Sequence, residues 1–329
     1  MFSGFKPTGE IHLGNYIGAV RHWVAQQDAY DAFICVVDLH AMTVPWDPQR
    51  LRAWTTRGAA MLIGCGIEPE RSVLFVQSQV PAHAELAWIL GCIARMGELR
   101  RMVQFKEKSR GESESVGVGL FTYPVLQAAD VLLYAADGVP VGEDQRQHIE
   151  LMRDLASRFN AVFGETFVVP QAWVPPAGAR IMALDDPTQK MSASFAEDRP
   201  ASAIFLQDPP EVISRKIRSA VTDSGREVRA GADKPALTNL LAIMSVMTDT
   251  PVPELEDRFA SAGYAAFKAS LADAIIERLT PIREGYNELL ADRDGLAKVL
   301  SRGAERADAV AEETMALVRE RTGLSTPPR

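Results

Sequence analysis

The sequence predicts an α/β protein with a doubly wound parallel sheet in its first part and an all-α second part. In the first part, short apolar runs alternate with segments whose apolar residues recur at helical spacing, which is the pattern of βαβ units. From about residue 201 onward, only helical spacing is evident. The length of 329 residues agrees with about two domains.

The expected strands are short, and the apolar run at 32–37 is typical of a buried parallel strand. Asp47 and Pro48 mark the start of a helix, because proline is favoured in a first helical turn. A Gly-, Ser- and Glu-rich loop is expected at 111–119. The expected strands are 1–9, 32–37, 72–77 and 139–141. The expected helices are 16–27, 48–64, 81–96, 97–110, 124–135, 143–160, 212–221, 236–247, 253–260, 264–290 and 297–321.

The formal net charge is −8, from 35 basic and 43 acidic residues. A negative total weighs against a nucleic-acid partner, because phosphate contacts need Lys and Arg. Local clusters matter more than the total, however, and basic residues gather at 95–101, 106–110 and 215–218. Each cluster alone is also compatible with a solvated helix face.

The three cysteines, Cys35, Cys65 and Cys92, fit no zinc or redox spacing. We therefore expect packing roles for them and no protein-bound metal site. No apolar run approaches the roughly 18 residues that span a bilayer, and the first residues do not resemble a signal peptide. These features predict a cytoplasmic protein with no membrane contact.

A candidate phosphate site lies at residues 7–15, where a tight turn precedes a helix. Free N–H groups at a helix N-terminus bind phosphate, and Gly14 permits a close approach to the backbone. His12 and Asn15 are possible donors to phosphate oxygens. An ordinary βα turn with an incidental histidine would give the same pattern.

Two later segments suit a nucleotide. Residues 142–145 lie between an expected strand and helix, where an acid can hold ribose hydroxyls, although Asp144 could also serve as a helix-capping residue. Residues 190–194 place one lysine and two serines in a loop, which suits a clamp on pyrophosphate. Taken alone, this second segment would be a surface loop.

Helical spacing places Tyr123, Gln127 and Asp130 on one otherwise apolar face. A carboxylate in such a place is costly unless it finds a partner. The partner of Asp130 could be an arginine, a backbone N–H or the N–H of a ligand.

In their order along the chain, these segments resemble the class I aminoacyl-tRNA synthetases. H-L-G-N at 12–15 and K-M-S-A-S at 190–194 look like the two signatures of that class, usually written HIGH and KMSKS. The stretch P-V-G-E-D-Q-R-Q-H at 140–148 is similar to the tryptophanyl-tRNA synthetases of the tyrosine/tryptophan subgroup. The similarity extends from Phe2 to about Gly323.

The resemblance implies a role for each matching position. The catalytic positions would be His12, Asn15, Lys108, Lys190 and Ser192. The ATP-binding positions would be Lys6, Pro7, Thr8, Gly14, Asn15, Gly142, Glu143, Asp144, Gln145, Ile181, Lys190, Met191, Ser192, Ala193 and Ser194. The tryptophan-binding positions would be Phe2, His40, Tyr123, Gln127, Asp130, Val139 and Val141.

The resemblance also implies an activity and a domain plan. The enzyme would activate L-tryptophan with ATP and Mg²⁺ to tryptophanyl-adenylate, release pyrophosphate, and transfer the amino acid to tRNA(Trp) with release of AMP. Asp130 would accept the indole N–H. A Rossmann-like catalytic domain would occupy 1–198 with a helical connecting insertion at about 45–121, and an anticodon-binding helical domain would occupy 199–329. The family works as a homodimer, and we expect the insertion to form the dimer contact.

The chain departs from the family pattern at two positions. Ala193 replaces the second lysine of KMSKS, and Lys6 stands where bacterial members often have glutamine. We hypothesise that Lys6 marks an auxiliary form tuned against a tryptophan-like inhibitor. The alternatives are a tyrosine-specific homologue, a catalytically weak paralogue that binds tRNA or regulates, and a generic nucleotide-binding α/β protein.

Overall fold

The computed structural model describes residues 1–102, 117–140, 142, 145–173 and 180–325, apart from the side chains of residues 194 and 197. Its centre is a parallel sheet in the order β1-β2-β3, and β4 and β5 form a second parallel pair that contacts β1. The strands are β1 (Phe2–Phe5), β2 (Phe33–Val36), β3 (Val73–Val76), β4 (Gly138–Pro140) and β5 (Gln171–Trp173). All four predicted strands are therefore present.

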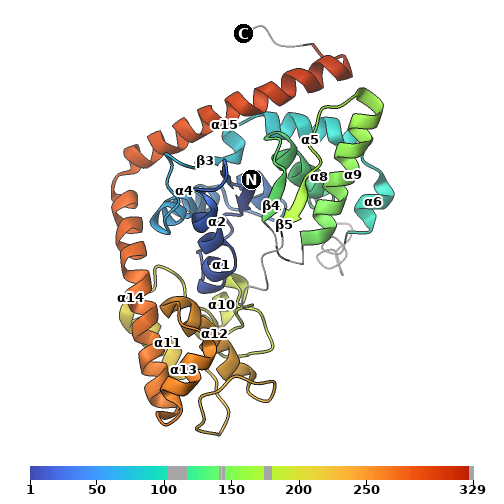
Figure 1. Ribbon diagram of the computed structural model, residues 1–329. Helices are drawn as coiled ribbons and strands as arrows, with labels where there is room; N and C mark the ends of the chain where they lie inside the picture. Colours follow the sequence, from blue (N-terminus) through green and yellow to red (C-terminus); the bar gives the residue numbers. More distant parts are fainter. Residues whose placement is uncertain (103–116, 141, 143–144, 174–179, 326–329) are drawn as a thin grey trace.

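Helices surround the sheet in the first part of the chain (Figure 1). They are α1 (Leu13–Asn15), α2 (Arg21–Gln26), α3 (Asp38–Ala41), α4 (Pro48–Gly64), α5 (Ala82–Ile93), α6 (Met96–Arg100), α8 (Val118–Leu132), α9 (Arg146–Phe163) and α10 (Ala193–Asp198). Between them lie a π-helix, η1 (Tyr16–Val20), and the 3-10 turns η2 (Gln77–Gln79) and η4 (Pro200–Ser202).

The alternating side chains of the strands divide the interior into two cores. Phe33 and Phe75 point toward the core built with α5, α8 and α9. Ile34 and Leu74 point toward the other core, which α2 and α4 share with the C-terminal helices. Because the sheet is covered on both faces, its strands are almost entirely apolar, as a doubly wound arrangement requires.

Three predicted helices show the main differences from the structure. The helix predicted from Pro124 begins earlier, at Val118, and runs through the proline. Its first residues therefore lie in the segment 111–119 that is predicted to be a loop. The helix predicted at 97–110 is described only as α6, which ends at Arg100, and residues 103–110 lie outside the described part. The predicted helix at 16–27 opens with the π-helical turn η1 before α2.

The second part is helical, as predicted. Its helices are α11 (Pro210–Ser219), α12 (Pro235–Thr248), α13 (Val252–Phe259), α14 (Gly263–Ala291) and α15 (Arg293–Thr322). Figure 1 shows α11, α12 and α13 grouped away from the sheet, with α14 leading back toward it. None of the described helices is apolar over a length that would cross a membrane.

The last helix, α15, packs against β3 and α5 rather than with α11–α13. The approach is close, because a Cβ added at Gly303 would lie 1.8 Å from the carbonyl oxygen of Leu74. Since β3 is an edge of its sheet, α15 shields an edge that could otherwise pair with another chain. The predicted domain boundary at 198/199 stays a prediction, but α15 belongs by contact to the sheet.

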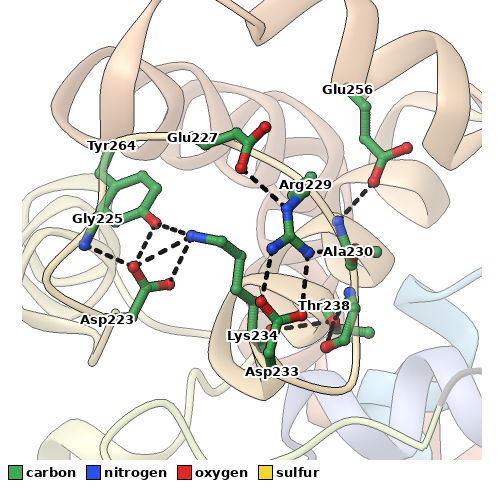
Figure 2. A network of polar contacts seen from close by, with 11 residues as sticks. Asp223, Gly225, Glu227, Arg229, Ala230, Asp233, Lys234, Thr238, Glu256 and Tyr264 are labelled. Atoms are coloured by element: carbon green, nitrogen blue, oxygen red, sulfur yellow. Dashed lines mark hydrogen bonds and ion pairs between the residues drawn. The ribbon is translucent and has the colours of Figure 1, made fainter.

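Side-chain bonds hold the connection between α11 and α12, which has no helix or strand of its own (Figure 2). Asp223 accepts hydrogen bonds from Lys234 Nζ at 3.1–3.2 Å and from the Tyr264 hydroxyl at 2.7 Å. Arg229 pairs with Glu227 at 2.9 Å and with Asp233. The connection is therefore an ordered part of the helical region.

Candidate active site

His12 and Asn15 form a reciprocal cap at the start of α1. The backbone N–H of Asn15 donates to His12 Nδ1 and the backbone N–H of His12 donates to Asn15 Oδ1, both at 3.3 Å. Burial and the neighbouring charge of Lys190 lower the pKa of His12 to about 4. The ring is therefore neutral at pH 7, and because Nδ1 accepts, its proton is on Nε2. His12 can thus act as a neutral N–H donor.

The K-M-S-A-S segment is anchored directly beside this cap. The backbone N–H of Met191 donates to the carbonyl of Ile181 at 3.0 Å, and both side chains are buried in the core. A Cβ at Gly14 would lie 3.5 Å from Met191 Cβ and 3.1 Å from the ring of His12. The two signature segments, far apart in sequence, therefore touch, while Lys190 itself is exposed.

An open cleft of about 760 Å³ lies along these segments. Its walls bring together predicted residues from both signatures and from the turn after β1. These residues are Lys6, Thr8, His12, Asn15, Ser192 and Ala193. Pro7 is buried beneath the cleft surface. Ammonium, hydroxyl, imidazole and amide donors around one cleft suit a polyanion such as a nucleotide phosphate chain.

A second, enclosed site centres on Asp130 of α8, which is 1% exposed. Its Oδ1 lies 2.6 Å from Gln77 Nε2 and 2.6 Å from His83 Nδ1, and its Oδ2 lies 2.7 Å from His40 Nε2. Burial alone would raise the pKa of Asp130, but the neighbouring rings of His40 and His83, with their hydrogen bonds, hold it well below its usual range. Asp130 is therefore a buried, ionised carboxylate.

The other predicted tryptophan-pocket residues lie around Asp130. Tyr123 meets the ring of His40 edge-on at 6.2 Å, and burial raises its pKa to about 12, so the phenol keeps its proton. Its hydroxyl lies 2.7 Å from His148 Nε2. Phe2 stacks on Tyr134 at 5.6 Å.

Two further predicted positions extend this group. Val139 of β4 is buried in the same core as Phe2. Gln127 donates to Gln145 at 3.4 Å, which joins a predicted tryptophan position to a predicted ATP position. The carbonyl of Gly142 accepts the backbone N–H of Gln145 at 3.0 Å.

Several predicted residues cannot be placed. Lys108, Val141, Glu143 and Asp144 lie outside the described residues, as does the side chain of Ser194. Where the chain is described, no group of three His, Cys, Asp or Glu side chains is arranged to hold a metal.

The sequence interpretation omitted Gln77, His83 and Tyr134, which surround Asp130. Gln77 had a detectable signal, because it follows β3 at the carboxyl end of a parallel strand, where ligands bind in open α/β sheets. His83, in the mostly apolar helix α5, had only a weak signal. Tyr134 lies just after the end of α8 and looks like an ordinary apolar position in the sequence.

Comparisons with known proteins agree with this geometry. The family model described as "tRNA synthetases class I (W and Y)" matches residues 1–280. A tryptophan–tRNA ligase of Caldanaerobacter subterraneus subsp. tengcongensis is 53% identical over 325 residues, which cover 98% of each chain. The tryptophan–tRNA ligase 2 of Streptomyces avermitilis is 52% identical over 98% of this chain and 96% of its own length.

Solved structures give the same picture. The tryptophanyl-tRNA synthetase of Mycoplasma pneumoniae superposes with a TM-score of 0.88 at 36% identity, over 98% of this chain and 97% of the other. The Campylobacter jejuni enzyme, solved with ADP and tryptophan, gives a TM-score of 0.85 at 34% identity over 98% and 99% of the two chains. A tyrosyl-tRNA synthetase of Archaeoglobus fulgidus, at 21% identity and a TM-score of 0.68, shares the fold.

Proposed function

This chain belongs to the class I tRNA synthetases of the tryptophan and tyrosine group, and from that premise we propose that it activates L-tryptophan with ATP and charges tRNA(Trp). The relatives that support tryptophan extend over nearly the whole chain. The observation that carries the proposal is Asp130, an ionised carboxylate buried beside the nucleotide cleft and held by three donors.

In the activation step, the tryptophan carboxylate attacks the α-phosphorus of ATP, and the bond to pyrophosphate breaks. No covalent bond to the enzyme is needed, so the rate acceleration comes from positioning of the substrates and from stabilisation of charge in the transition state. We assign His12 Nε2–H and the side-chain amide of Asn15 to the phosphates, and Lys190 to the charge that develops on the leaving pyrophosphate. Lys108 stays a prediction for the same role.

Mg²⁺ is proposed to enter with ATP, bound through phosphate oxygens, rather than through a protein ligand set. The support is general chemistry: Mg²⁺ usually keeps several waters and binds through substrate phosphates with few protein ligands. When bound, the ion would neutralise part of the phosphate charge. The chain's own cations, Lys6 and Lys190, would act alongside it.

In the transfer step, the 2′-hydroxyl of the terminal tRNA adenosine attacks the adenylate carbonyl, and AMP leaves. The proposed anticodon contact lies in the helical region at 199–329, in which α11–α13 are grouped away from the sheet (Figure 1). ATP, tryptophan and tRNA meet in the cytoplasm, where we propose that the protein acts.

Tryptophan specificity follows from Asp130. The indole N–H can donate to the carboxylate, whereas phenylalanine would leave it unpaired. A site that needs such a donor rejects an analogue lacking it by roughly 10⁴–10⁵. With discrimination of that size, the enzyme needs no separate editing reaction. Tyrosine specificity is not favoured, because relatives that are 52–53% identical over nearly the whole chain are tryptophan–tRNA ligases.

A homodimer is proposed from large apolar side chains that are exposed on three helices in and beside the predicted insertion. Trp88 of α5 is 76% exposed, Val118 of α8 is 74% exposed, and Met96 of α6 is 58% exposed. Both α5 and α6 contact α8. Apolar surface of this kind is typical of a protein–protein contact. Replacing Trp88 with Glu should shift the mass in sedimentation from dimer to monomer, and an unchanged mass would argue against this surface.

The test of the function is ATP–pyrophosphate exchange with each amino acid in turn, followed by charging of tRNA. Exchange should require tryptophan, with tyrosine near background, and single-turnover assays should give tryptophanyl-tRNA. Exchange that depends on tyrosine would favour the tyrosine-specific alternative. Tight tRNA binding without exchange or charging would favour the catalytically weak paralogue.

A further inference from the structure

Three buried side chains outside the predicted tryptophan pocket hold the carboxylate of Asp130 in one orientation. We propose that Gln77, His83 and Tyr134 are positioning residues for tryptophan specificity. Gln77 and His83 fill Oδ1 of Asp130, Tyr134 orients His83, and one position on Oδ2 is left for the indole N–H. The proposal rests on the proposed role of Asp130 as the acceptor of that N–H. Gln77 and His83 are fully buried, so they act through Asp130 rather than on the cleft.

The orientation of the Gln77 amide is fixed from both ends. Its Oε1 accepts the backbone N–H of Leu39 at 3.1 Å, so its Nε2 must be the group that donates to Asp130 at 2.6 Å. Leu39 precedes His40 on α3, and Asp38 ties the same short helix to Ser78 through bonds of 3.0 and 2.5 Å. The backbone that carries His40 is therefore fastened to the segment that carries Gln77.

The proton positions of His83 follow from its two partners. Its Nδ1 lies 2.6 Å from Asp130 and its Nε2 lies 2.8 Å from the Tyr134 hydroxyl. Burial raises the pKa of Tyr134, so its phenol keeps its proton. Within the described residues that proton has one acceptor, Nε2, and a buried O–H without an acceptor is costly. Tyr134 therefore donates, and His83 is neutral with its proton on Nδ1.

The carboxylate of Asp130 has one acceptor position that the described side chains leave unused. Each carboxylate oxygen can accept about two hydrogen bonds. Gln77 and His83 fill Oδ1, whereas Oδ2 receives His40 alone among the residues described. One position on Oδ2 stays open for a fourth donor. If a donor to Oδ1 is lost, the carboxylate can turn and accept water instead, and the preference for an indole N–H falls.

The experiment compares tryptophan with β-(3-benzothienyl)alanine, in which sulfur replaces the indole N–H. ATP–pyrophosphate exchange is measured with the full chain carrying Tyr134→Phe, His83→Leu or His83→Asn. We expect Tyr134→Phe and His83→Leu to lower kcat/KM for tryptophan about 10-fold, mainly through KM, because a charge-assisted hydrogen bond is lost or misdirected. His83→Asn, whose amide N–H can take the place of Nδ1–H, should recover part of the loss.

With the sulfur analogue, kcat/KM of the same variants should stay within about 2-fold of the wild-type value, because this substrate has no indole N–H to donate to Asp130. A matched control is Tyr286→Phe, because Tyr286 is 8% exposed and belongs to the core on the other face of the sheet. Loss of its hydroxyl should leave kcat/KM unchanged for both substrates. Equal losses with both substrates would overturn the proposal, because they would indicate a structural role only. If the wild type itself had equal kcat/KM for the two substrates, Asp130 would not be the acceptor of the indole N–H. That result would reject the proposed role of Asp130 and, with it, this proposal.

Discussion

The nucleotide cleft and the Asp130 site differ in how their groups are held. The cleft is an open space of about 760 Å³, and Lys190, whose charge helps to lower the pKa of His12, is exposed. Asp130 is 1% exposed and held by three hydrogen bonds of 2.6–2.7 Å. Phosphates are bound by charge, which tolerates movement, whereas discrimination among amino acids requires a preorganised acceptor. Substitutions in the cleft should therefore change the rate, and substitutions around Asp130 should change specificity.

The largest effect in the cleft is expected from Lys190→Ala. Its ammonium is proposed to meet charge that develops in the transition state, so kcat for exchange should fall roughly 100- to 1,000-fold. The KM for tryptophan should change little, because the Asp130 site is untouched. Steady-state kinetics of exchange, with Lys298→Ala on the exposed side of α15 as a control, would check this. A loss that appears in the tryptophan KM would break the distinction between the two regions.

The two sites should respond to acid in different pH ranges. The pKa of His12 is about 4 in the folded chain and 6.5 ordinarily, so the unfolded chain takes up a proton that the folded chain does not. Stability is therefore full above pH 6.5 and falls as the pH drops toward 4, by about 3 kcal/mol. The pKa of Asp130 is lowered from 3.8, so its contribution is lost only below that pH.

Urea unfolding at pH 7 and at pH 4.5 would separate these contributions. The His12→Asn variant should lose less stability between the two pH values than the wild type does. An identical loss in both proteins would mean that His12 is not held neutral in the cleft.

The smallest effect is expected at Lys6, which lies where the two regions meet. Its Nζ donates to Thr43 Oγ1 at 3.3 Å, and that hydroxyl donates to the carbonyl of His40 at 2.8 Å. Lys6→Gln removes a point charge from the wall of the cleft. Inhibition of exchange by a tryptophan analogue should become a few-fold tighter if Lys6 serves inhibitor resistance. Unchanged inhibition would reject that hypothesis.

The sequence predicted the strands and the C-terminal helices because their apolar spacing is local information. The start of α8 could not be predicted in this way, since Pro124 looks like a first-turn proline although the helix begins at Val118. The packing of α15 on β3 was also not predicted, because it depends on a close approach between Gly303 and a backbone carbonyl from a distant segment. At the candidate site, Asp130 was recognisable as a carboxylate on an apolar face, but its partners come from three separate elements. Only the tertiary fold brings Gln77 and His83 to it.

The most direct test of the account is tryptophan-dependent ATP–pyrophosphate exchange by the wild type and by Asp130→Ala, measured side by side at pH 7.5. Far-UV circular dichroism would verify that both proteins are folded. The account predicts that the wild type requires tryptophan and that the variant loses more than about 100-fold in kcat/KM, because the indole N–H loses its acceptor. A folded variant with wild-type exchange, or a wild type without exchange, would contradict it.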